Sequence, residues 1–71
     1  MNKNIVAPLP GIILEILVAP GDYVEPGQAV VVLEAMKMEN ELQVEFAGVV
    51  SIVNVSVGDS VLAGTVIITI D

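Results

Sequence analysis

Hydrophobic and polar side chains alternate along most of this chain with the two-residue period of β-strands, and no stretch keeps the 3.6-residue period of a helix. In residues 38–44, for example, Leu42 and Val44 alternate with Glu41 and Gln43. The apolar runs predict strands at residues 4–7, 11–18, 23–24, 29–35, 38–44, 48–55 and 65–71. Glycine and proline clusters separate these runs, so the pattern predicts an all-β chain with short turns.

The two halves of the chain repeat each other at an offset of 37 positions. At this offset all six glycines form pairs: Gly48 falls on Gly11, Gly58 on Gly21 and Gly64 on Gly27. Glycine is needed where the backbone requires a positive φ or a close approach, so paired glycines indicate that the halves share their turns. We therefore expect residues of about 1–34 and 38–71 to fold alike, with four strands each and eight in all.

Neither half could bury its apolar face alone, so the two halves must interlock. The sequence predicts a single domain over residues 1–71, built as a flattened eight-stranded antiparallel barrel or sandwich of two four-stranded sheets with pseudo-two-fold symmetry. The hairpin at residues 34–39 would lie at one end of it. The pseudo-two-fold axis would place Met1 and Asp71 at the other end.

The strand patterns also predict which side chains point inward. In residues 11–18 the even-numbered positions are apolar and should form the inner face, with Glu15 on the outer face. The next long run is apolar at too many positions to show its own alternation, but the repeat places Ala29, Val31 and Leu33 inward.

Composition removes several kinds of site. The chain has 71 residues and neither Cys nor His, which excludes disulfides, the usual zinc sites, a thiol nucleophile and an imidazole base. Hydrophobic residues make up 55% of it, so dense aliphatic packing has to stabilise the small core. The carboxylates occupy outward strand positions and turns, which favours a solvated surface over paired acid–base chemistry. We therefore predict no catalytic residue and no metal ligand, and expect a chain that is not itself an enzyme.

Asp22 and Asp59 each follow one of the paired glycines. They could be metal ligands, or their carboxylates could accept hydrogen bonds from nearby backbone N–H groups and close a turn. Because a structural need recurs in both halves while an active site usually does not, the repeat favours the turn.

The net charge of −7 argues against nucleic acid and anionic membrane surfaces as partners, because both are negatively charged. No apolar run approaches the roughly 18 residues that a membrane span requires, and Pro8 and Pro10 interrupt the only apolar region near the start. We expect a cytoplasmic chain with no membrane insertion.

The stretch EAMKMEN, residues 34–40, lies at the junction of the two repeats and has Lys37 at its centre. A lone lysine on a hairpin is most often a solvated charge. Here, however, the chain has only two lysines, and Met36 and Met38, its only methionines besides Met1, flank this one. Exposed methionines suggest a surface that a partner contacts. The stretch also lacks the Asn-Gly or Asp-Gly pair that tight hairpins favour, as happens where side chains serve a function.

The run EAMKMEN closely resembles the biotin-attachment motif of biotinyl domains, the carboxyl carriers of biotin-dependent carboxylases and decarboxylases. The resemblance extends over essentially the whole chain, from VAPLPG through GDYVEPG and VGDSVLAG to the last strand, and implies a biotinyl/lipoyl-type hammerhead fold. It implies that Lys37 is the covalent attachment site of the cofactor biotin, with Glu34, Ala35, Met36 and Met38 flanking it.

The resemblance also implies partners. A biotin protein ligase would join biotin to the ε-amine of Lys37. The biotin arm would then carry a carboxyl group between a biotin carboxylase or decarboxylase site and a carboxyltransferase site.

Two alternatives remain open. A lipoyl domain shares the doubled barrel, although Met36 and Met38 argue against it, because lipoyl domains normally carry an acidic residue before the lysine and often Ala after it. The other is an unmodified barrel-like adaptor module.

Overall fold

The computed structural model describes residues 3–71, and these residues form eight strands and no helix. The strands are β1 Lys3–Val6, β2 Gly11–Ile16, β3 Tyr23–Val24, β4 Ala29–Ala35, β5 Met38–Gln43, β6 Gly48–Val53, β7 Ser60–Val61 and β8 Val66–Ile70. The predicted strands are all present. β2 and β6 end slightly earlier than predicted, because the chain leaves the sheet there for a turn.

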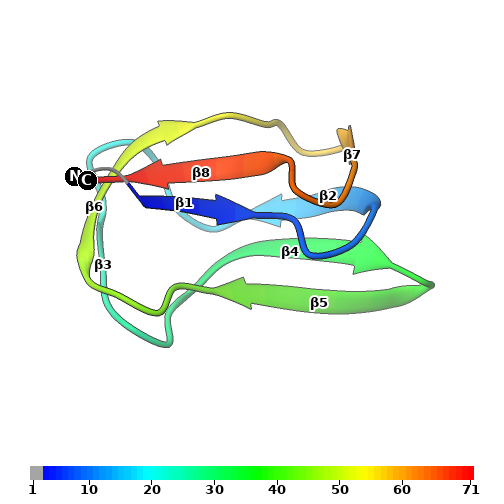
Figure 1. The fold of residues 1–71 in the computed structure, drawn as a ribbon, viewed down its shortest axis with the longest axis horizontal. Coiled ribbons are helices and arrows are strands. Elements are labelled where there is room, and N and C mark those ends of the chain that lie inside the picture. Colours follow the sequence, from blue (N-terminus) through cyan, green and yellow to red (C-terminus); the bar gives the residue numbers. More distant parts are fainter. Residues whose placement is uncertain (1–2) are drawn as a thin grey trace.

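The strands pair into two four-stranded antiparallel sheets, in the orders β1-β8-β6-β3 and β5-β4-β2-β7 (Figure 1). Replacing each strand by the one four places along the chain converts one order into the other. The two sheets are therefore related by the predicted pseudo-two-fold symmetry, and the predicted all-β fold is confirmed.

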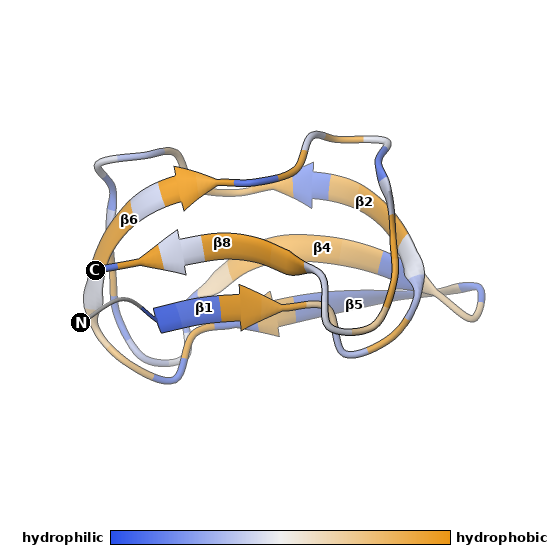
Figure 2. Cartoon of the chain, turned by 45° about the horizontal axis from the view of Figure 1, so that its top comes forward, coloured by the Kyte–Doolittle hydropathy of each residue, from blue (hydrophilic) through white to orange (hydrophobic). Residues whose placement is uncertain are grey.

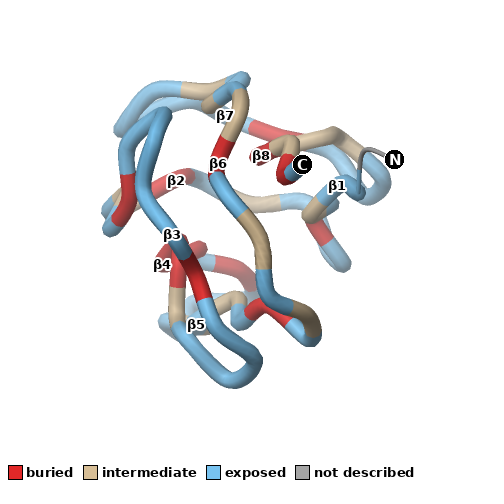
Figure 3. Tube along the Cα trace, turned by 90° about the vertical axis from the view of Figure 1, so that its left-hand side faces the viewer, coloured by how far each residue is buried: buried red, intermediate tan, exposed pale blue. Residues whose placement is uncertain are grey.

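The core lies between the two sheets and consists of aliphatic side chains. Buried residues occur in stretches along the strands, while the connecting turns are mostly exposed (Figure 3). Hydrophobic residues are concentrated on β4, β6 and β8, whereas β5 is largely hydrophilic (Figure 2). The largest fully buried side chains are Ile13, Leu33, Ile67, Ile68 and Ile70, followed by Val24, Val30, Val31, Val44 and Val50. Burial of this aliphatic surface stabilises the fold in a chain without cysteine.

The predicted inner face of β2 is wrong at its start. Ile13 is fully buried, while Ile12 is 43% exposed. The cause is a β-bulge at Leu14: Ile13 pairs with Leu33 and Glu15 pairs with the adjacent Val32, so Leu14 has no partner. A bulge of one residue reverses the alternation on either side of it.

The same irregularity recurs in the second half. In β6, Val50 pairs with Ile70 and Ile52 with Thr69, which leaves Ser51 unpaired at the position equivalent to Leu14. The 37-residue repeat therefore includes these β-bulges as well as the glycines.

A second pair of bulges lies in β4 and β8. Val31 and Leu33 are fully buried, as predicted, but Ala29 is only partly buried. Val30 is also fully buried, because the register of β4 shifts between Ala29 and Val31. The equivalent Ile67 in β8 is skipped by the register with β1 and is fully buried too.

The turns after β2 and β6 have the predicted construction. Gly21 and Gly58 have φ angles of 96° and 93°, in the left-handed region that favours glycine. The N–H of Ala19 donates to Oδ2 of Asp22 at 2.9 Å. In the other half, the N–H of Ser56 donates to Oδ2 of Asp59 at the same distance. Both aspartates therefore close turns, which confirms the structural interpretation of this pair.

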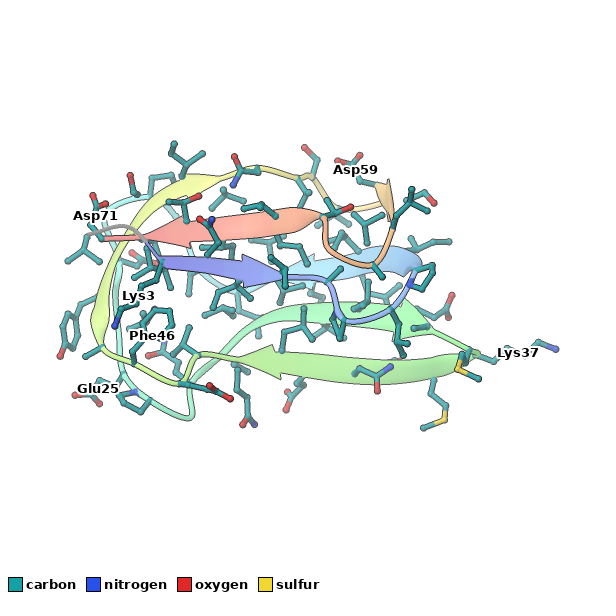
Figure 4. All side chains as sticks on the ribbon, viewed as in Figure 1. Lys3, Glu25, Lys37, Phe46, Asp59 and Asp71 are labelled. Atoms are coloured by element: carbon teal, nitrogen blue, oxygen red, sulfur yellow. The ribbon has the colours of Figure 1, made fainter. Side chains whose placement is uncertain are left out.

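The molecule is elongated, with extents of 31 × 19 × 17 Å, and the hairpin between β4 and β5 lies at one end of the longest axis (Figure 4). Asp71 lies at the opposite end, as predicted, and Met1 falls outside the described residues. Within residues 3–71 no helix is long and apolar enough to cross a membrane.

Candidate functional site

The hairpin at the end of the molecule is a two-residue turn between two well-paired strands. Glu34 pairs with Glu39 and Ala35 with Met38, which leaves only Met36 and Lys37 in the turn. Pairing between β4 and β5 continues through to Ala29 and Gln43. A ladder of this length fixes the direction of the turn relative to the barrel.

Met36 and Lys37 both have positive φ angles, 54° and 62°. They are the only non-glycine residues of the described chain with this conformation. A two-residue turn of the favoured type I′ requires positive φ at both positions, which explains why Asn-Gly is the usual choice. For other residues the conformation costs roughly 1–2 kcal/mol each. Strain of this kind persists where particular side chains are needed, and it concentrates at functional sites.

The side chains of this turn are exposed on the outside of the molecule. Met36 is 82% exposed and Met38 63%, and Lys37 is also exposed. In Figure 4 the Lys37 side chain extends away from the barrel, beyond the last paired residues of β4 and β5. The ε-amine is therefore accessible to an enzyme that approaches this end.

Two residues hold the base of the hairpin. Ala35 is buried, with 4% exposure, and so ties β4 to the core next to the turn. The Nδ2 of Asn40 donates to the carbonyl oxygen of Met38 at 3.2 Å. Nothing in the sequence assigns this role to Asn40, although its amide stands among the glutamates of the same strand.

Glu34 and Glu39 are exposed and directly opposite each other on neighbouring strands. Like charges in such a pair are destabilising. Together with the positive φ angles, this pair makes the hairpin locally unfavourable, and it places negative charge on both strands that lead to Lys37.

Lys3, the second lysine, is in a different environment. Its Nζ lies 4.5 Å from the centroid of the Phe46 ring, a cation–π contact at the opposite end of the molecule (Figure 4). The two lysines therefore differ in position and in surroundings.

Within residues 3–71 no three Asp or Glu side chains gather in a metal-binding arrangement, and no cavity is present. The reactive group of the hairpin is one primary amine, that of Lys37, which the paired strands β4 and β5 hold in place. Such an amine can act as a nucleophile toward an activated carboxyl group supplied by another protein, and the resulting amide would tether the acyl group at the end of the barrel.

The family described as "Biotin-requiring enzyme" matches residues 3–70. The chain is 53% identical over 64 residues to the biotin carboxyl carrier protein of Streptococcus mutans, covering 90% of this chain and 49% of that protein. It is 44% identical over 66 residues to the propionyl-CoA carboxylase alpha chain of Ruegeria pomeroyi, covering 93% of this chain and 10% of the relative. It is 41% identical over 70 residues to the biotinylated protein TB7.3 homolog of Mycobacterium leprae, covering 99% of both.

Solved structures with the same fold include the urea carboxylase of Kluyveromyces lactis. The similarity has a TM-score of 0.93 and 30% identity, and covers 100% of this chain and 6% of that one. A single-chain, multi-domain long-chain acyl-CoA carboxylase matches with a TM-score of 0.90 and 31% identity, over 96% of this chain and 7% of that one. The chain thus spans about half of one carrier protein and a small part of the large carboxylases.

Proposed function

Because this chain belongs to the family of biotin-requiring enzymes, we propose that it is a biotin carboxyl carrier domain that bears biotin on the ε-amine of Lys37. A biotin protein ligase would form the amide bond between Nζ of Lys37 and the carboxyl carbon of biotin. In that step the amine loses a proton, and the group that activates the carboxyl leaves with the electrons of the broken C–O bond.

The observation that carries this assignment is the turn of Met36 and Lys37. Both residues keep a positive φ that glycine would adopt at lower cost, and both side chains are exposed. A hairpin selected for stability alone would use Asn-Gly. The retained lysine, at the outermost point of a rigid ladder, suits a group that has to enter the active site of another enzyme.

The carrier would take a carboxyl group from a biotin carboxylase or decarboxylase site and deliver it at a carboxyltransferase site. Supporting this, the relatives include propionyl-CoA carboxylase and pyruvate carboxylase chains, of which this chain covers only 10% and 6%. A tethered carrier reaches several active sites at high effective concentration without binding any of them tightly. The domain itself would perform no catalysis, since its partners supply the acid–base groups.

A lipoyl-bearing role and an unmodified adaptor are not favoured, because the relatives named above are biotin carriers and carboxylases.

The proposal is tested by the intact mass of the chain after expression in a host that contains its own ligases. We expect an increase of one biotinyl group, which fragmentation places on Lys37. The increase of a lipoyl group, or an unchanged mass in a folded protein, would contradict the proposal.

A further inference from the structure

The sulfur atoms of the described residues are all beside Lys37. The chain has no cysteine and three methionines, and within residues 3–71 only Met36 and Met38 contain sulfur. The sulfur atoms drawn in Figure 4 lie at the tip of the hairpin, next to the Lys37 side chain. Both thioether groups therefore belong to residues adjacent to the proposed attachment site of biotin.

The two methionines do not serve the packing of the core. Methionine commonly fills irregular gaps inside a protein, but the buried residues here are Ala, Val, Leu and Ile, and Met36 and Met38 are 82% and 63% exposed. Elsewhere the large aliphatic side chains on the surface are valine, isoleucine or leucine, such as Leu62. Leucine replaces methionine with little change of volume. The thioether is thus what distinguishes the hairpin from the other exposed apolar side chains.

An exposed thioether can be oxidised to a sulfoxide by hydrogen peroxide. A lone pair of the sulfur forms an S–O bond, the O–O bond of the peroxide breaks, and the second oxygen leaves as water. The sulfur loses two electrons, and the peroxide gains them. Hydrogen peroxide is uncharged, so the carboxylates of Glu34 and Glu39 on the two strands of the hairpin do not repel it.

Oxidation changes the surface on both sides of the Lys37 amine without changing the amine. It converts a flexible apolar side chain into a polar one, whose S–O oxygen is a hydrogen-bond acceptor. An enzyme that acts on Nζ of Lys37 has to cover the exposed side chains of the neighbouring residues 36 and 38. A polar group covered in this way without a hydrogen-bond donor is unfavourable, so oxidation disfavours the complex.

We propose that Met36 and Met38 are a peroxide-sensitive modification site, and that their oxidation to sulfoxides slows the attachment of biotin to Lys37. This inference rests on the proposed function and adds a reversible control to it. Methionine sulfoxide reductases restore the thioether. In that step two thiols supply two electrons and become a disulfide, and the sulfoxide oxygen leaves as water.

The test compares the parent with the double variant Met36→Leu, Met38→Leu, which removes both thioethers and nearly keeps their volume. Unmodified chains are treated with hydrogen peroxide, freed of it, and incubated with a purified ligase, ATP and biotin. The measurement for each chain is the initial labelling rate after treatment divided by the rate before it. Any effect of leucine itself cancels in this ratio.

We expect peptide masses to show one added oxygen atom on Met36 and one on Met38 of the treated parent. Its labelling rate should fall about ten-fold, the effect of one polar group covered without a partner. Methionine sulfoxide reductases with a thiol should restore the rate. The treated double variant, which retains Met1, should label as fast as it did before treatment.

Thermal melts establish that the treated chains are folded, and the parent should melt as before because both methionines are exposed. An oxidised, folded parent that labels at its original rate would overturn the inference. So would an equal loss of rate in the double variant, a loss that accompanies unfolding, or peroxide that oxidises free methionine but neither Met36 nor Met38. A folded, untreated parent that accepts no biotin would overturn the proposed function and this inference together.

Discussion

Met36 and Lys37 occupy a backbone conformation that costs each of them roughly 1–2 kcal/mol. For a domain whose whole stability is of the order of 5–15 kcal/mol, this is a substantial expense. The strands could be joined by Asn-Gly without it. At the scale of single residues, the side chains of this turn are therefore present for what they do at the surface.

The strain at Met36 predicts the effect of Met36→Gly on stability. Glycine would relieve roughly 1–2 kcal/mol at φ 54° and lose about 0.5–1 kcal/mol through the greater freedom of the unfolded chain. The net gain, about 0.8 kcal/mol at the centre of these ranges, should raise the melting temperature by roughly 3–6 °C.

Met38→Gly is the matched control, because Met38 is a paired residue of β5 without a positive φ. Glycine there should lower the melting temperature, since it only adds freedom to the unfolded chain. If calorimetry shows that Met36→Gly has a melting temperature at or below that of the parent, the backbone at Met36 is not strained as proposed.

The sequence predicted Lys37 and its flanking residues as the candidate site, because EAMKMEN stands out at the junction of the repeats. It did not predict the positive φ angles, since no letter in Ala35-Met36-Lys37-Met38 favours that conformation. Their cause is the pairing of Ala35 with Met38, which leaves only Met36 and Lys37 to reverse the chain.

At the scale of strands, two glycines hold equivalent positions at the two ends of the barrel. A methyl group at Gly11 would overlap the carbonyl oxygen of Glu34, at the base of the hairpin. One at Gly48 would lie 2.5 Å from the carbonyl oxygen of Asp71, at the far end. Only glycine allows β2 and β6 to approach these residues so closely.

We therefore expect Gly11→Ala and Gly48→Ala to destabilise the fold by similar amounts, about 1–3 kcal/mol, because in each case backbone has to move. Their effects on biotin incorporation should differ. Gly11→Ala displaces Glu34 and with it the hairpin, and should lower kcat/KM for the ligase several-fold at a temperature where both variants are folded.

The two variants serve as controls for each other in melts and labelling assays run side by side. Equal labelling of both would show that the close approach of Gly11 to Glu34 does not set the position of Lys37. A large difference in their stabilities would show that the two ends of the barrel are not equivalent.

The alternation of apolar and polar residues predicted which segments form strands. The 37-residue repeat predicted that these strands form two four-stranded sheets. The inner faces of β2 and β4 could not be predicted fully, because bulges at Leu14 and Val30 shift the alternation within each strand. A bulge depends on the register with the neighbouring strand, which cannot be read from the sequence of one strand alone.

At the scale of the whole molecule, the paired strands of the barrel hold the hairpin at one end, and Asp71 lies at the opposite end. A ligase that docks on this arrangement would recognise the position of the Lys37 amine relative to the barrel rather than the local peptide sequence. An amine moved along the hairpin by one residue shifts by about 3.3 Å and points in another direction.

Two exchanges test this recognition: Met36→Lys with Lys37→Met, and Met38→Lys with Lys37→Met. Both keep the composition and net charge of the parent. We expect both to be labelled far more slowly, because transfer depends on near-attack geometry. Circular dichroism establishes that they are folded, and folded exchanges labelled at nearly the parental rate would refute recognition by structure.

The attachment of biotin to Lys37 is tested most directly by measuring biotin incorporation into three purified chains: the parent, Lys37→Ala and Lys3→Ala. Each is incubated with ligase, ATP and biotin, and the product is followed by intact mass and avidin blot. The parent and Lys3→Ala should each gain one biotinyl group, whereas Lys37→Ala should gain none while melting close to the parent, because residue 37 is exposed. Biotin on a folded Lys37→Ala chain, or none on a folded parent, would contradict the assignment.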